Sequence, residues 1–194
     1  HWMVRRQRQM CIRDRFITGG GSGIGASIVE HFCEQGSEVY FVDIDLKGTK
    51  KLLKKIKKKK FRLPTFIECN LLDINKLEKI IKNIITKKGP IHALVNNAAN
   101  DDRHTTDQVD EKYWENRMAI NLKHYFFAAK AVVKSMKKMK AGSIVNLSSV
   151  SWVLGEGDKV VYETAKSAVV GLTRSFAKEY GKYNIRTNSV VPGS

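Results

Sequence analysis

The chain has 194 residues, which is enough for one domain with a sizeable core but too few for two. Apolar residues make up 42% of the sequence and no apolar run is long enough to cross a bilayer, so the composition excludes a disordered chain and predicts a soluble protein with no membrane partner. The formal net charge of +16 raises the question of a nucleic-acid partner, which the distribution of the charges must answer.

Residues 1–15 differ in composition from the rest of the chain. They hold five arginines and no lysine, whereas residues 16–194 hold 25 lysines and five arginines. The segment lacks the apolar stretch of a signal peptide and is short for a basic nucleic-acid arm. We therefore expect residues 1–15 to be a non-native leader and the folded domain to span residues 16–194.

From residue 16 onward, short apolar runs alternate with longer segments of helical periodicity. This alternation predicts a single α/β domain of the doubly wound Rossmann type, in which helices cover both faces of a parallel sheet. The expected strands are 16–18, 38–43, 65–69, 91–96, 143–147 and 184–190. The expected helices lie near 24–35, 47–60, 75–88, 110–139 and 160–181.

A glycine-rich segment, TGGGSGIG at residues 18–25, follows the first expected strand and opens the first helix. Glycines there permit a tight turn and let the backbone approach a pyrophosphate, whose charge free N–H groups and the helix dipole stabilise. Asp43 ends the second strand, where a carboxylate can bind an adenosine ribose and would repel the 2′-phosphate of NADP. This favours NAD; the alternative is an aspartate that caps a turn or helix, as Asp45 could also do.

Eight lysines fall between Lys50 and Lys60, with Leu52, Leu53 and Ile56 at helical spacing among them. This pattern predicts an amphipathic surface helix with a solvated basic face. No aromatic residues that could stack on bases are interleaved, and the sequence has no nucleic-acid-binding motif. We therefore expect no nucleic-acid partner, and keep a non-catalytic binder of nucleic acid or of an anionic surface as the alternative from another class.

Four polar residues in the second half of the chain are candidates for chemistry. Tyr162 and Lys166 lie four apart on an expected helix and so share one face. A tyrosine hydroxyl has a pKa of about 10 and is a poor base near neutrality unless a cation such as Lys166 stabilises the phenolate. Ser149 follows a strand at the carboxyl edge of the expected sheet, where its hydroxyl could bind a reacting oxygen. Asn121 lies inside the expected helix 110–139, and by itself it is an ordinary helix asparagine.

Together these residues resemble the short-chain dehydrogenase/reductase family, from residue 16 to the end of the chain. The resemblance rests on residues 18–25, Asp43, NNAA (96–99), Asn121, SIVNLSS (143–149), YETAK (162–166) and VPG (191–193), in the family's order and spacing. It implies a catalytic tetrad of Asn121, Ser149, Tyr162 and Lys166. It also implies an NAD site, with NADP less favoured, formed by Thr18, Gly19, Ser22, Gly23, Ile24, Gly25, Asp43, Asn70, Leu71, Asn97, Ala98, Tyr162, Lys166, Pro192 and Gly193. Two positions depart from the family pattern: Asn70 replaces a common aspartate, and Ala99 replaces a common glycine.

The segments NDDRH (100–104), YWENRMAINLKH (113–124) and SVSWVLGEGDKVVYETAK (149–166) resemble bacterial NAD-dependent sugar 1-dehydrogenases. This implies oxidation of the anomeric C1–OH of an aldose, a pentose such as D-xylose, to a lactone. The implied substrate residues are Asp101, Arg103, Ser149, Trp152 and Tyr162. Reduction of a 3-oxoacyl thioester or another carbonyl by the same tetrad is the alternative. Without the resemblance, residues 101–104 would be interpreted as a solvated loop and Trp152 as a core residue.

The remaining expectations concern context. Neither the three cysteines nor the five histidines lie at a metal-ligand spacing, so we expect no metal site, and the cysteine usage suits a reducing cytoplasm. The chain ends just after VPG, where the family continues through a substrate-covering segment, a further helix and a seventh strand. We therefore expect a C-terminally truncated chain that is unstable or inactive alone, and a full-length parent that forms a homo-oligomer.

Overall fold

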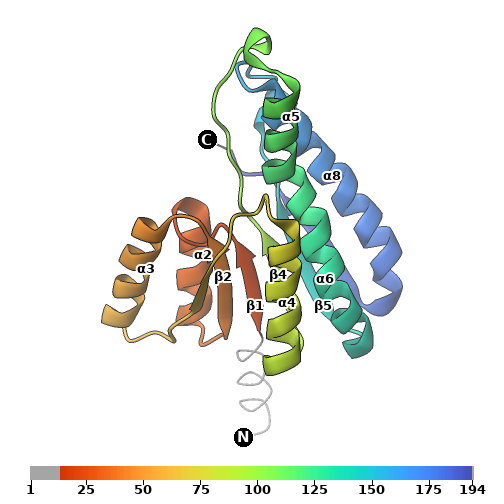
Figure 1. Cartoon of the computed structure of the whole chain (residues 1–194). Helices are drawn as coiled ribbons and strands as arrows, with labels where there is room; N and C mark the ends of the chain where they lie inside the picture. Colours follow the sequence, from red (N-terminus) through yellow and green to blue (C-terminus); the bar gives the residue numbers. More distant parts are fainter. Residues whose placement is uncertain (1–13, 194) are drawn as a thin grey trace, which may run out of the picture.

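The computed structural model describes residues 14–193. Within them, a six-stranded parallel sheet has the order β3-β2-β1-β4-β5-β6, with helices on both of its faces (Figure 1). The strands are β1 (Arg15–Thr18), β2 (Val39–Asp43), β3 (Thr65–Glu68), β4 (Ala93–Asn96), β5 (Gly142–Leu147) and β6 (Ile185–Val190). The strand order reverses between β1 and β4, as in a doubly wound sheet. The predicted Rossmann-type fold is confirmed.

Helices alternate with these strands along the chain. They are α2 (Gly23–Glu34), α3 (Leu46–Lys58), α4 (Ile74–Lys88), α5 (Glu111–Met118), α6 (His124–Met139), α7 (Ser151–Leu154) and α8 (Val160–Tyr180), with short 3₁₀ turns at Thr106–Gln108 and Gly181–Tyr183. The expected helix over 110–139 is continuously helical from Glu111 to Met139, but a π-helical turn at Ala119–Lys123 divides it into α5 and α6, which was not expected. A π turn accommodates one extra residue per turn, which apolar periodicity does not reveal. The short helix α7 was also not expected.

Two apolar cores lie on opposite faces of the sheet, because successive side chains of a strand point to opposite faces. Phe16 of β1 packs in the core formed with α4, α6 and the end of α8. The next residue, Ile17, packs in the core formed with α2 and α3. Both side chains are fully buried. The apolar run of the first strand therefore serves both layers, which explains why it shows no polar alternation.

The lysine-rich segment forms α3, and its apolar side is buried as predicted. Leu52 and Ile56 are 5% and 0% exposed. Lys55 and Lys59 each form an ion pair with Glu30 of α2, at 2.6 and 2.7 Å. Part of the basic face thus fastens α3 to α2. None of the described helices is long and apolar enough to span a bilayer.

The first strand begins one residue earlier than expected. Arg15 pairs with Val39 of β2 and with Ala93 of β4, so the sheet includes the last residue of the expected leader. Residues 1–13 of that leader lie outside the described residues. The other expected strand ends agree with the structure to within two residues.

Candidate active site

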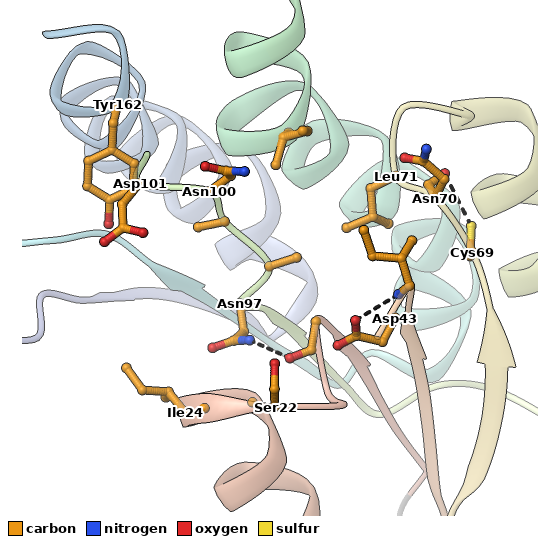
Figure 2. A pocket seen from close by; sticks show the side chains of 17 residues that line it. Ser22, Ile24, Asp43, Cys69, Asn70, Leu71, Asn97, Asn100, Asp101 and Tyr162 are labelled. Atoms are coloured by element: carbon orange, nitrogen blue, oxygen red, sulfur yellow. Dashed lines mark hydrogen bonds between the residues drawn. The ribbon is translucent and has the colours of Figure 1, made fainter. Parts of the chain in front are cut away.

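A cleft lies at the carboxyl edge of the sheet, where the strand order reverses. Its main cavity has a volume of about 560 Å³ and is bordered by the segments that follow β1, β2, β3 and β4 and by Tyr162 of α8 (Figure 2). A neighbouring cavity of about 360 Å³ shares Asp101 and Tyr162 with the first and extends to Ser149 and Lys166. Open α/β sheets bind ligands at this edge. Most of the candidate residues from the sequence lie there.

The glycine-rich turn lines the main cavity and is closely packed against the segment after β4. A Cβ at Gly25 would lie 1.8 Å from the carbonyl oxygen of Gly19. The side-chain amide of Asn97 donates to that carbonyl at 2.8 Å (Figure 2). Gly23 has a positive φ of 53°, and beyond its chain neighbours and the backbone of α2 no described atom lies within 4 Å of the position of its Cβ. The start of α2 thus exposes its backbone to the cavity, an arrangement that fits a pyrophosphate.

Thr18 does not have the expected place in the cofactor site. Its side chain is fully buried and lines neither cavity. The hydroxyl accepts hydrogen bonds from the backbone N–H groups of Asn97 and Ala98, at 3.1 and 3.2 Å. It also lies 3.4 Å from Nε2 of His124. As the last residue of a central strand, Thr18 points into the protein and fastens the segments after β1 and β4 together beneath the turn.

Asp43 lines the main cavity, and its carboxylate is held by backbone N–H groups. Oδ2 accepts from Gly21 at 2.6 Å, and Oδ1 accepts from Ile44 and Asp45 at 2.7 and 2.8 Å. Asp45 is the residue that caps α3, since it accepts from Gly48 at 2.8 Å. Asp43 therefore fixes the glycine-rich turn and borders the cavity at the same time.

The segments after β3 and β4 complete the wall of the main cavity with Asn70, Leu71 and Ala98. Oδ1 of Asn70 accepts from the N–H of Leu72 at 3.0 Å, so this amide also stabilises its own turn. Ala99 is not among the residues with positive φ. A glycine is therefore not needed at this position, and the departure from the family pattern is accommodated.

Tyr162 lines both cavities, and Ser149 and Lys166 line the smaller one with it. Burial raises the pKa of Tyr162, and this effect outweighs the lowering effect of the nearby Ser149 hydroxyl, which itself hydrogen-bonds to the Ser151 hydroxyl at 2.9 Å. Burial lowers the pKa of Lys166 to about 7, against the opposing effect of the Asp101 carboxylate. In Figure 2 the Asp101 carboxylate lies beside the Tyr162 ring.

In the protein without cofactor the pKa of Tyr162 is raised, and Lys166 is not among the groups that shift it. The ammonium lies 5.5 Å from the centroid of the Tyr162 ring. It donates to the carbonyl of Leu147 at 2.7 Å and to the hydroxyl of Tyr125 at 3.0 Å. Because the side chain is held against these two groups, the spacing of four residues gives proximity without a contact between ammonium and phenol oxygen.

Asn121 lies in the π turn, fully buried, and lines neither cavity. Its Oδ1 accepts from the N–H of Asn100 at 2.8 Å, and its Nδ2 donates to the carbonyl of the same residue at 2.9 Å. Both ends of the amide are thus bonded to the loop that carries Asp101. The side chain of Asn121 positions that loop.

The expected substrate residues are only partly brought together. Asp101, Arg103, Ser149 and Tyr162 line the smaller cavity, together with Pro192 and Gly193 of the expected cofactor site. Trp152 does not line it, and its Nε1 is buried without a hydrogen-bond partner among the described residues. The position of Trp152 outside this cavity therefore does not support the prediction that it contacts the substrate.

Sequence reasoning missed Glu156 and Lys159, which line the smaller cavity. Their side chains form an ion pair at 2.5 Å. Both lie in the segment 149–166. Glu156 lies between Gly155 and Gly157, and Lys159 directly precedes α8. The signal that could have found them is the spacing of an acidic and a basic residue, three positions apart, just before the helix that carries Tyr162 and Lys166.

The comparisons with known proteins agree with this geometry. The family profile described as short chain dehydrogenase matches residues 15–194. The chain belongs to the short-chain dehydrogenase family. It is therefore an oxidoreductase that acts on CH–OH groups and uses a nicotinamide dinucleotide, NAD or NADP.

Relatives of this dehydrogenase include proteins named for sugars. It is 42% identical over 178 residues to the D-xylose 1-dehydrogenase of Caulobacter vibrioides. The aligned region covers 92% of this chain and 70% of the relative. It is 40% identical over 184 residues to the "Probable galactose dehydrogenase" of Rhizobium meliloti. The aligned region covers 94% of this chain and 72% of that relative. The crystal structure of levodione reductase is similar with a TM-score of 0.86 at 28% identity, over 93% of this chain and 71% of that structure.

His104 connects the two loops that border the smaller cavity of the dehydrogenase. Its Nε2 lies 3.3 Å from the backbone N–H of Val161, at the start of α8. Its Nδ1 lies 2.9 Å from the hydroxyl of Tyr113, and its backbone N–H donates to the carbonyl of Asp158 at 2.6 Å. The side chain is 5% exposed.

We expect His104→Ala to raise the KM for the alcohol substrate about tenfold, because one or two hydrogen bonds that order the substrate loops are lost. The Kd for the dinucleotide should stay within about twofold, since His104 lies outside the main cavity. His104→Gln can restore an acceptor for Val161 and should recover most of the effect. Steady-state kinetics with separate titration of the cofactor measure both; an unchanged substrate KM in the alanine variant would contradict this role.

Proposed function

We propose that this dehydrogenase oxidises the anomeric C1–OH of an aldose, a pentose such as D-xylose, to the sugar lactone with NAD. The observation that carries the proposal is the smaller cavity, in which Asp101, Arg103, Ser149 and the Glu156–Lys159 pair lie around Tyr162. A cavity lined by several hydrogen-bonding side chains suits a polyhydroxylated substrate better than an acyl chain. The names of the two sugar dehydrogenases among its relatives support the same substrate class.

The residues of the main cavity fit a nicotinamide dinucleotide. The exposed start of α2 at Gly23 would hold the pyrophosphate, and Asp43 would accept hydrogen bonds from the adenosine ribose. Asn70 and Leu71 would border the adenine, while Pro192 and Gly193 would border the nicotinamide end. The carboxylate of Asp43 would repel a 2′-phosphate, which favours NAD over NADP. A bound NAD would supply the hydride acceptor and a positive charge next to Tyr162.

The protein's own residues would handle the proton of the substrate hydroxyl. Tyr162, in its ionised form, would take the proton from the C1–OH. Ser149, whose hydroxyl lies close enough to Tyr162 to affect its pKa, would donate to the same substrate oxygen and orient it. Protonated Lys166, whose Nζ lies 5.5 Å from the Tyr162 ring centroid, would favour the phenolate electrostatically. Asn121 would act by fixing the loop that holds Asp101.

The substrate class and the cofactor are tested by three assays on the same preparation. With NAD and a panel of pentoses and hexoses, we expect NADH formation with at least one aldose, accompanied by a lactone. With NADP in place of NAD, we expect kcat/KM to fall by about tenfold or more, the effect of a penalty of about 1.4 kcal/mol at the ribose site. With NADPH and a 3-oxoacyl thioester, we expect no turnover. Oxidation of NADPH by the thioester, without activity on any sugar, would overturn the proposal.

A further inference from the structure

Three polar atoms form a closed, buried cluster behind Tyr162. Nζ of Lys166 donates to the Leu147 carbonyl at 2.7 Å and to the Tyr125 hydroxyl at 3.0 Å. The Tyr125 hydroxyl in turn donates to the same carbonyl at 2.9 Å. Tyr125 and Lys166 are 0% and 1% exposed. The cluster joins the end of β5, the start of α6 and the face of α8 that carries the catalytic pair.

We propose that Tyr125 is a positioning residue for Lys166, whose hydroxyl holds the ammonium against the Leu147 carbonyl and leaves its remaining N–H to the cavity at Tyr162. The inference rests on the proposed role of Lys166 in catalysis and does not depend on which alcohol is oxidised. An ammonium has three hydrogens. Two of them are used inside the cluster, so one is left for the cavity that Lys166 lines.

The aromatic rings support the same arrangement. Nζ of Lys166 lies 5.2 Å from the centroid of the Tyr125 ring and 5.5 Å from that of the Tyr162 ring. The cation is therefore within the range of a cation–π interaction with both rings. Tyr125 itself is fixed, because its hydroxyl also lies 3.4 Å from the carbonyl of Ala98 after β4. A fixed acceptor of this kind limits the positions that the long lysine side chain can adopt.

The hydroxyl of Tyr125 also affects the protonation of Lys166. Four groups on the surrounding elements face the ammonium: Asp101 after β4, His124 and Tyr125 at the start of α6, and Tyr162 on α8. His124 is neutral, since burial and the nearby Lys166 lower its pKa to about 3. Burial lowers the pKa of Lys166, and the Asp101 carboxylate raises it. A hydroxyl that accepts a hydrogen bond from the ammonium favours the charged form and so also raises this pKa.

The test is a direct titration of Lys166 in the protein without sugar or cofactor. Lysine labelled with ¹³C at Cε gives a signal whose shift follows the charge of the amine, and Lys166→Met identifies the signal by its loss. We expect Tyr125→Phe to lower the midpoint of this titration by about one pH unit, the effect of losing one hydrogen bond to a charged group. Tyr180 is another buried tyrosine and lies 14 residues after Lys166 on α8. Tyr180→Phe removes its hydroxyl and should leave the midpoint of the Lys166 titration unchanged.

A second variant keeps the test decisive if Tyr125→Phe does not fold. Replacing Tyr125 by 3,5-difluorotyrosine retains the ring and the hydroxyl but makes the oxygen a weaker acceptor, so the midpoint should again fall. In the active enzyme, the pH at which kcat/KM declines on the alkaline side should fall by the same amount, because protonated Lys166 is the functional form. A Lys166 titration identical to that of the unmodified protein in both variants would overturn the proposal. A shifted titration in a protein that oxidises no sugar would overturn the proposed function alone.

Discussion

Tyr162→Phe should lower kcat by about 10²- to 10⁴-fold, the range lost when a positioned acid or base is removed. The change deletes only the hydroxyl of Tyr162, and it retains the ring whose centroid lies 5.5 Å from Nζ of Lys166. The Kd for NAD should change by less than about threefold, because the contacts expected to bind it come from the glycine-rich turn and Asp43. Single-turnover kinetics together with fluorescence titration of the cofactor separate the two effects.

Tyr183→Phe is the matched control for this experiment. Tyr183 lies in the 3₁₀ turn after α8, at the opposite end of that helix from Tyr162, and is partly buried. The same loss of one hydroxyl there should leave kcat within about twofold. If Tyr162→Phe retained more than a tenth of the kcat of the unmodified enzyme, Tyr162 would not be the group that moves the proton.

Gly25→Ala should abolish tight dinucleotide binding and lower the stability of the fold by about 1–3 kcal/mol, as overpacking of a close contact does. The added methyl group would lie 1.8 Å from the Gly19 carbonyl oxygen and 2.5 Å from Nδ2 of Asn97. These atoms belong to the turn and to the side chain that supports it, so both must shift. Differential scanning calorimetry and a cofactor titration measure the two consequences.

Gly171→Ala supplies the opposite result in the same protein. Gly171 is an exposed residue inside α8, and beyond its chain neighbours and the backbone of α8 no described atom lies within 4 Å of the position of its Cβ. An alanine there should raise the free energy of unfolding by about 0.5–1 kcal/mol, since glycine is the poorer helix former. Equal behaviour of the two variants would show that the close approach at Gly25 has no role in forming the turn.

The sequence predicts the sheet well because its strands are short apolar runs between glycines, polar turns and amphipathic helices. The two cores around Phe16 and Ile17 require such runs, so burial and pattern agree. The sequence also predicts residues that are needed for the backbone conformation of the turn, such as Gly25. Asp43 shows the limit of this prediction. The sequence offers a turn-capping role and a place in the cofactor site as alternatives, whereas in the structure the carboxylate both accepts from the turn and lines the cavity.

Other features depend on tertiary contacts that no local pattern contains. Tyr125 lies in an apolar helical segment and reads as a core residue, although its hydroxyl contacts Lys166, 41 positions away. Thr18 belongs to the glycine-rich motif, yet its strand position turns it inward. The direction of the Lys166 side chain likewise follows from a carbonyl on β5, which helical spacing to Tyr162 does not predict.

The π turn at Ala119–Lys123 makes the length of this segment as important as its composition. Each residue of a helix rotates the following chain by about 100° about the helix axis. Losing a single residue from the turn would restore α-helical winding there, and it would rotate Asn121, which lies in the turn, away from the Asn100 backbone. Evolution and protein engineering can therefore exchange side chains along this helix more freely than they can shorten or lengthen it.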